Sequence, residues 1–126
     1  MSHGSFATAI NCMDGRVQLP VITYLRERHG VDYVDVITEP GPIKALSERS
    51  DQTVLESIRR RLEISVVKHR SQHVAVVGHH DCAGNPVGKD VQLKQIAAAV
   101  ETVKSWGFDC EVTGLWVDED WNVHEV

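Results

Sequence analysis

The sequence predicts an α/β fold: one three-layer domain over residues 1–126, with a mainly parallel central sheet and an antiparallel edge strand from a C-terminal hairpin. Two observations lead to this prediction. Short segments rich in apolar residues alternate with longer segments whose apolar residues recur at helical spacing, which is typical of parallel strands joined by helices. The last two apolar segments instead flank an acidic turn, which favours a hairpin. A chain of 126 residues is long enough to build its own core.

The first half of the chain is predicted to form a strand, a helix, a second strand and a loop, in that order, at Phe6–Asn11, Leu19–His29, Tyr33–Thr38 and Glu39–Arg49. Proline suits the first turn of a helix and glycine suits the position after its last turn, so Pro20 and Gly30 mark the ends of this helix. Pro40, Gly41 and Pro42 exclude regular structure at the start of the loop. We therefore expect a surface loop here and treat it as a candidate active-site loop.

The second half is predicted to form a helix, a strand, a helix and the two hairpin strands, at Asp51–Lys68, His73–Gly78, Asp90–Trp106, Cys110–Val117 and Trp121–Val126. Asp51 suits the N-cap of the first of these helices, and Ser65 is the polar exception in its apolar stripe. The Val-rich third strand suits burial on both faces of a sheet. The last helix is predicted to turn five residues inward: Val91, Ile96, Ala97, Val100 and Val103.

Two short polar segments follow the first and third strands. Cys12-Met13-Asp14-Gly15-Arg16 comes directly after the first strand, and His79-His80-Asp81-Cys82 comes directly after the third. If the second and third strands pair on opposite sides of the first, a crevice opens at the carboxyl ends of the first and third strands. We expect both segments to meet in that crevice.

The residue types in these segments are those that zinc prefers. Zinc binds thiolate and imidazole in tetrahedral geometry, and a catalytic zinc keeps one position open for water or substrate. Cys12, His79 and Cys82 would supply three ligands for one zinc ion per chain. The fourth position is left open to water or to Asp14.

CxDxR after the first strand and HxxC after the third resemble the β-class carbonic anhydrases over most of the chain. The resemblance implies that Cys12, His79 and Cys82 are metal ligands and that Asp14 with Arg16 forms a catalytic pair controlling access to the zinc. It also implies a zinc lyase that reversibly hydrates carbon dioxide by zinc-bound hydroxide. Carbon dioxide or bicarbonate would then be the small-molecule substrate.

Three other functions remain open at this point. The segment Thr38–Pro42 differs from the turn usual in that family, which leaves a zinc hydrolase acting on a related small substrate. The first strand begins near Phe6 without the helical arm that usually precedes it, which leaves a non-catalytic zinc-containing binding module. Thiol redox chemistry between Cys12 and Cys82 is a further alternative.

The remaining cysteine and histidines are expected to have ordinary structural places. Cys110 has no Cys or His close in sequence and is expected in the core. His80 is expected beside the site or facing solvent. The others are expected on the surface: His3, His29, His69, His73 and His124.

Composition restricts the partners. The net charge of −5 argues against nucleic acid, which usually requires a basic face. The apolar runs are too short to cross a membrane, the N-terminus lacks the pattern of a signal peptide, and three cysteines are a poor disulfide framework. We therefore expect a cytoplasmic protein. Many folds of this kind dimerise through a sheet edge or helices, so a homodimer remains open.

Overall fold

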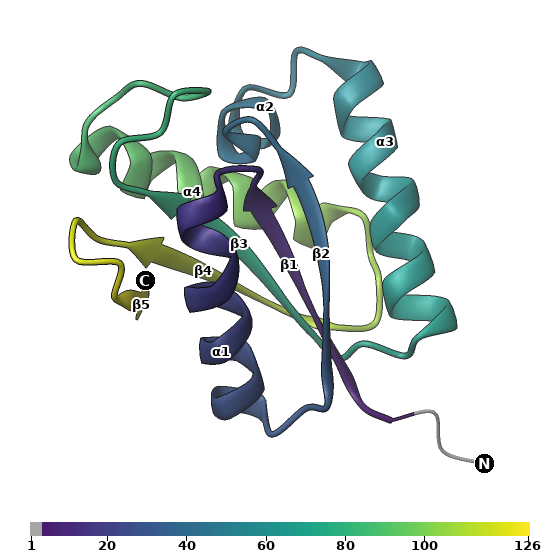
Figure 1. Ribbon diagram of the computed structural model, residues 1–126. Coiled ribbons are helices and arrows are strands. Elements are labelled where there is room, and N and C mark those ends of the chain that lie inside the picture. The colour runs from purple at the N-terminus through teal and green to yellow at the C-terminus, as the bar shows by residue number, and fades with distance from the viewer. Residues whose placement is uncertain (1–3) are drawn as a thin grey trace.

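The computed structural model describes residues 4–126, which form a five-stranded sheet in the order β2-β1-β3-β4-β5 (Figure 1). The expectation for His3 lies outside the described residues. The strands are β1 (Phe6–Cys12), β2 (Tyr33–Glu39), β3 (His73–His79), β4 (Glu111–Val117) and β5 (Val123–Glu125). The helices are α1 (Gln18–His29), α2 (Pro42–Glu48), α3 (Gln52–Glu63) and α4 (Lys89–Ser105), with a 3-10 turn at Gly15–Val17 and a π-helical turn at Ile64–Lys68. β4 and β5 pair antiparallel and the other pairs are parallel, which confirms the predicted fold class.

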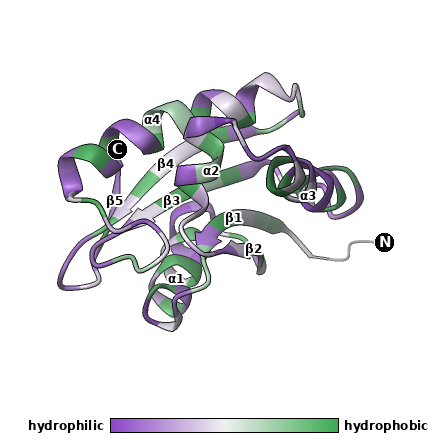
Figure 2. Cartoon of the chain, turned by 90° about the horizontal axis from the view of Figure 1, so that it is seen from above, coloured by the Kyte–Doolittle hydropathy of each residue, from purple (hydrophilic) through white to green (hydrophobic). Residues whose placement is uncertain are grey.

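The helices divide between the two faces of the sheet. α1 lies on one side, and α2, α3 and α4 lie on the other (Figure 2). On the α1 side, Val21 and Leu25 pack against small residues of β1 and β3. On the other side, larger residues such as Ile10, Ile58 and Ile96 form the second core. Because both faces are covered, β1 and β3 are buried along nearly their whole length.

The crevice arises where two neighbouring strands stop pairing. β1 pairs with β3 only as far as Ile10 and Val76. The outer pairs continue further, to Cys12 beside Glu39 and to His79 beside Val117. β1 and β3 therefore separate at their carboxyl ends while their outer neighbours hold them, as expected where the chain reverses its direction of winding.

The segment predicted as the loop Glu39–Arg49 instead contains a helix, and that part of the prediction was wrong. Gly41, at φ 59°, turns the chain, and Pro42 then occupies the first helical position of α2, where its missing N–H costs nothing. Ile43 and Leu46 of this helix are buried. The prolines excluded regular structure only for the turn itself.

A group of buried hydroxyls joins the segment after α3 to the amino half of the sheet. Thr8 Oγ1 lies 2.6 Å from Ser65 Oγ in the π-helical turn and 2.7 Å from Ser71 Oγ. Ser65 Oγ in turn donates to Asp35 at 2.7 Å, and His69 Nδ1 lies 2.6 Å from the same carboxylate. We call these five residues the hydroxyl cluster. Ser65, the polar exception in the predicted stripe, is thus inward and hydrogen-bonded.

The last long helix begins and ends close to its predicted bounds, but its inward face is rotated. Val91 and Ala97, predicted inward, are exposed, whereas Gln92, Ala99 and Thr102 are buried. Thr102 donates to the Leu46 carbonyl at 2.7 Å, which ties α4 to α2. No helix within residues 4–126 is both long and apolar enough to span a bilayer.

The remaining single-residue expectations are partly met. Cys110 is half-buried against the core on the α4 side, and His80 is exposed. His69 and His124 are exposed as expected. His29 and His73 also reach the surface but are half-buried, and they stack with their ring centres 3.8 Å apart.

Candidate metal centre

Three potential metal ligands converge at the carboxyl ends of β1 and β3. Cys12 is the last residue of β1, His79 is the last residue of β3, and Cys82 follows on the next turn. Their ligand atoms lie within 4.8 Å of one another, and the two sulfur atoms are 3.8 Å apart. All three residues are buried. The chain therefore brings together the three residues that the sequence marked as ligands.

The His79 ring is fixed in one orientation. Its Nδ1 lies 2.7 Å from the His80 carbonyl, an acceptor, so Nδ1 carries the proton and Nε2 offers its lone pair when the ring is neutral. Nε2 is buried and has no hydrogen-bond partner among the described residues. A buried polar atom without a partner is costly, and a metal ion would remove that cost. The donor set of two sulfurs and one imidazole nitrogen fits zinc.

The two cysteines differ in acidity. Burial raises the pKa of Cys12, but the nearby His79 ring and the backbone N–H groups of Gly41 and Asp14 outweigh burial and lower it to about 7. Burial and the negative charge of Cys12 raise the pKa of Cys82 to about 11. Zinc binds the thiolate form, so zinc binding at neutral pH would release a proton from Cys82.

Polar side chains that the sequence analysis missed support the strand ends. Asn11 Oδ1 accepts from the Cys12 N–H at 2.9 Å, and Gln18 Nε2 donates to the Cys12 carbonyl at 2.6 Å. Gln92, buried on α4, accepts from the His79 N–H at 3.2 Å and donates to the His79 carbonyl at 2.8 Å. Gln92 lies four residues before the inward Ile96, and this spacing was a signal for its burial.

The turn before α2 and the loop after Cys82 are in close contact at Gly41 and Gly84. A Cβ added at Gly84 would lie 2.6 Å from the Pro40 carbonyl carbon, and one added at Gly41 would lie 2.8 Å from the Asn85 Cβ. Neither position can hold a side chain without a shift of backbone or of a rigid neighbour. The loop after Cys82 and the turn before α2 are therefore packed backbone against backbone.

The Asp14 carboxylate faces Arg16. Arg16 Nη2 donates to Asp14 Oδ2 at 2.7 Å and Arg16 Nε donates to Oδ1 at 3.1 Å, while the Arg16 N–H also donates to Oδ1 at 2.9 Å. These bonds hold the pKa of Asp14 at about 2. Asp14 does not belong to the group of converging ligand atoms. The two residues expected to form a pair do so.

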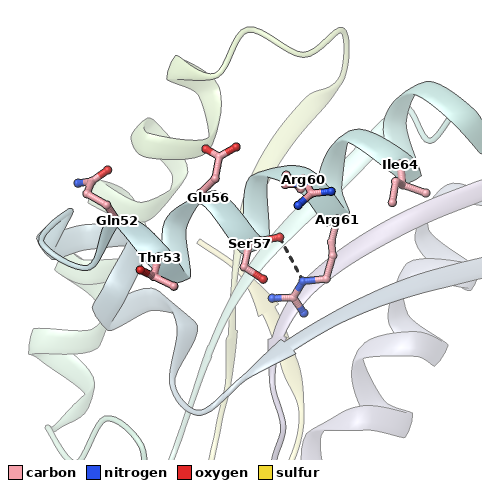
Figure 3. A pocket seen from close by; sticks show the side chains of 7 residues that line it. All are labelled: Gln52, Thr53, Glu56, Ser57, Arg60, Arg61 and Ile64. Carbon is pink, nitrogen blue, oxygen red and sulfur yellow. Dashed lines mark hydrogen bonds between the residues drawn. The ribbon is translucent and has the colours of Figure 1, made fainter.

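A small hollow of about 370 Å³ lies beside Cys82, between the turn that carries it and the start of α4. A larger hollow of about 560 Å³ lies on the exposed face of α3, away from the three ligands (Figure 3). There Arg61 bends back along its helix, with Nε donating to the Ser57 carbonyl at 3.2 Å, and its guanidinium pairs with Glu39 at the end of β2. Within residues 4–126, the group of converging metal-ligand atoms lies in the crevice and not in this hollow, so we assign the chemistry to the crevice.

Comparisons with known proteins agree with this geometry. A family model described as "Putative carbonic anhydrase" matches residues 2–126. A search of curated protein sequences finds no match.

Solved carbonic anhydrase structures share the fold. The β-carbonic anhydrase isoform I of the protozoan Trichomonas vaginalis superimposes with a TM-score of 0.63 at 16% identity, covering 99% of this chain and 85% of that chain. A carbonic anhydrase from Glaciozyma antarctica gives a TM-score of 0.60 at 16% identity, covering 94% and 80%. The likeness in structure extends over most of the chain, as does the family match. The chain therefore belongs to the family described as putative carbonic anhydrase, and it has the fold of the β-carbonic anhydrases.

Proposed function

We propose that this chain binds one zinc ion through Cys12, His79 and Cys82 and catalyses the reversible hydration of carbon dioxide. The observation that carries the proposal is the convergence of three buried ligand atoms in a crevice, with His79 Nε2 lacking any described protein partner. Family membership and fold support it. The substrate would be a small molecule, carbon dioxide or bicarbonate.

The position of Asp14 favours an open site. Its carboxylate is engaged by Arg16 and lies outside the group of converging atoms, which leaves a fourth position for water. A bound zinc would lower the pKa of water from about 15.7 to about 7 and so supply hydroxide at neutral pH.

Asp14 and Arg16 have separate roles in this proposal. Arg16 holds the carboxylate away from the three ligands through charge-assisted hydrogen bonds. Because the pKa of Asp14 is about 2, its carboxylate is ionised at neutral pH and can accept a hydrogen bond from water in the crevice. That bond would orient the water for attack on the substrate carbon.

The test is stopped-flow hydration of carbon dioxide by the full chain loaded with zinc. We expect one zinc per chain and a rate above that of buffer. Cys82→Ser should lose both, whereas Cys110→Ser, a matched change outside the site, should keep both. A wild-type protein that holds one zinc and shows no rate above buffer would contradict catalysis and leave a non-catalytic zinc module.

A further inference from the structure

The Arg16 side chain contacts three residues: Asp14, Asp81 and Trp121. Its Nε and Nη2 donate hydrogen bonds to the Asp14 carboxylate. Its Nη1 donates to Asp81 Oδ2 at 3.2 Å, and Nη2 also donates to the Asp81 carbonyl at 3.1 Å. The guanidinium carbon lies 4.6 Å from the centre of the Trp121 ring. Asp81 had no predicted role, and Trp121 fell in the predicted hairpin.

These contacts come from separate parts of the fold. Arg16 lies in the 3-10 turn after β1, Asp81 lies in the turn between the ligands His79 and Cys82, and Trp121 lies in the hairpin between β4 and β5. A guanidinium that is bonded at its edge and stacked on its face has few other orientations. Its side chain is nevertheless 47% exposed, so without such contacts it would sample solvent.

The backbone conformations of Asp81 and Trp121 indicate that their contacts with Arg16 form a specific arrangement. Among the described residues, four other than glycine have positive φ, and two of these are Asp81 at 58° and Trp121 at 64°. This region is unfavourable for a bulky side chain such as Trp and persists only where the surroundings hold it. Both residues therefore adopt uncommon backbone conformations while contacting the same guanidinium.

We propose that Asp81 and Trp121 are positioning residues that hold Arg16 against Asp14 and thereby keep the Asp14 carboxylate away from the metal. The inference rests on the proposed function of the crevice as a zinc site. Arg16 also bonds the carboxylate of Asp81, which belongs to the metal-binding turn. The state of the Asp14–Arg16 pair is thus coupled to the turn that carries Cys82 and to the hairpin.

The first test measures the position of Arg16 without reference to turnover. In zinc-loaded full chain labelled with ¹⁵N-arginine, the hydrogen-exchange rate at Arg16 Nε reports how firmly the group is bonded, and Arg16→Lys assigns its signal. We expect Asp81→Asn and Trp121→Leu each to raise this rate about two- to fivefold, as suits a partly exposed ion pair. Asn tolerates the positive φ of residue 81, so this change removes charge with little added strain.

Two further variants separate positioning from a general loss of structure. Trp121→Phe keeps an aromatic face under Arg16 and should restore a rate near that of wild type. Asp109→Asn, a matched change at an exposed aspartate away from Arg16, should leave the rate unchanged. Equal rates in wild type, Asp81→Asn and Trp121→Leu would overturn the proposal.

The second test follows the consequence for Asp14. Cobalt(II) in place of zinc has a visible spectrum that reports its ligands, so forms with and without Asp14 bound are distinguishable at one fixed pH. We expect Asp81→Asn and Trp121→Leu to shift the ratio of the two forms toward bound Asp14 by about two- to fivefold. The shift should vanish when Asp14→Asn is added. An unchanged ratio, or a shift that persists with Asp14→Asn, sinks the inference.

These readouts keep the two proposals distinguishable. Neither readout measures hydration of carbon dioxide. If the exchange rate and the cobalt spectrum both change as expected but the wild type shows no turnover, the proposed catalysis fails and the positioning role stands. If the wild type shows turnover but neither the exchange rate nor the cobalt spectrum changes in the variants, the positioning role fails and the proposed catalysis stands.

Discussion

β1 carries two buried polar groups near its opposite ends, and they differ in how their polar atoms are satisfied. Near its amino end, Thr8 belongs to the hydroxyl cluster, where Ser65 and Ser71 supply its partners at 2.6 and 2.7 Å. At its carboxyl end, Cys12 lies among sulfur and nitrogen atoms, and His79 Nε2 has no described partner. The same strand thus contributes to a network complete within the protein and to one that is incomplete.

This difference distinguishes a structural hydrogen-bond network from a candidate ligand-binding site. Buried polar groups normally find hydrogen bonds, and a group without them calls for an explanation. The hydroxyl cluster needs no ligand, since its five members bond one another. Among the candidate ligands, His79 Nε2 lacks a described partner, and a metal ion would provide one. A variant at each end should therefore have a different kind of effect.

The largest effect is expected at the carboxyl end. Cys12→Ser should reduce zinc content from one per chain to a small fraction, because a soft thiolate is replaced by a hydroxyl. At free zinc 100-fold above its Kd, the wild type should gain about 2.7 kcal/mol of stability that the variant lacks. Elemental analysis and urea unfolding with and without zinc measure both quantities. Full zinc occupancy in Cys12→Ser would exclude Cys12 as a ligand.

A smaller effect, independent of metal, is expected at the amino end. Thr8→Val keeps the shape of the side chain and leaves Ser65 and Ser71 each short of a partner, so stability should fall by about 1–3 kcal/mol. Zinc content should not change. Thr23→Val, at an exposed position of α1, is the matched control and should have little effect on urea unfolding. Loss of zinc on Thr8→Val would show that the two ends of β1 are not independent.

The smallest effect concerns pH. The folded pKa of Asp14 is about 2, below its ordinary value of 3.8, so its pairing with Arg16 stabilises the fold above about pH 4. That contribution is lost as pH falls from about 4 to about 2. In metal-free protein, the free energy of unfolding of wild type should exceed that of Asp14→Asn at pH 5, and the gap should be much smaller at pH 2. The gap should be smaller than the Thr8 effect because the pair is partly exposed. A gap that is the same at both pH values contradicts the lowered pKa.

Patterning in the sequence was sufficient for the strands and the two ligand segments, whereas the crevice depended on an assumed pairing of the second and third strands on opposite sides of the first. Apolar runs gave the strands, and the position of Cys12 and His79 directly after two of them gave the site. α2 could not be predicted, because Ile43 and Leu46 make too short an apolar pattern and the neighbouring prolines obscured it. The supporting role of Gln92 and the contacts of Asp81 and Trp121 depend on tertiary packing that no local pattern contains.

The contact between Gly84 and the turn at Pro40 and Gly41 constrains how such chains can vary. A side chain gained at either glycine would displace the other loop, so the two segments cannot diverge independently. Pro40, Gly41 and Gly84 therefore form one packed unit, although the two segments lie far apart in the sequence. In a search for further chains of this type, the two should be required together, as a single signal.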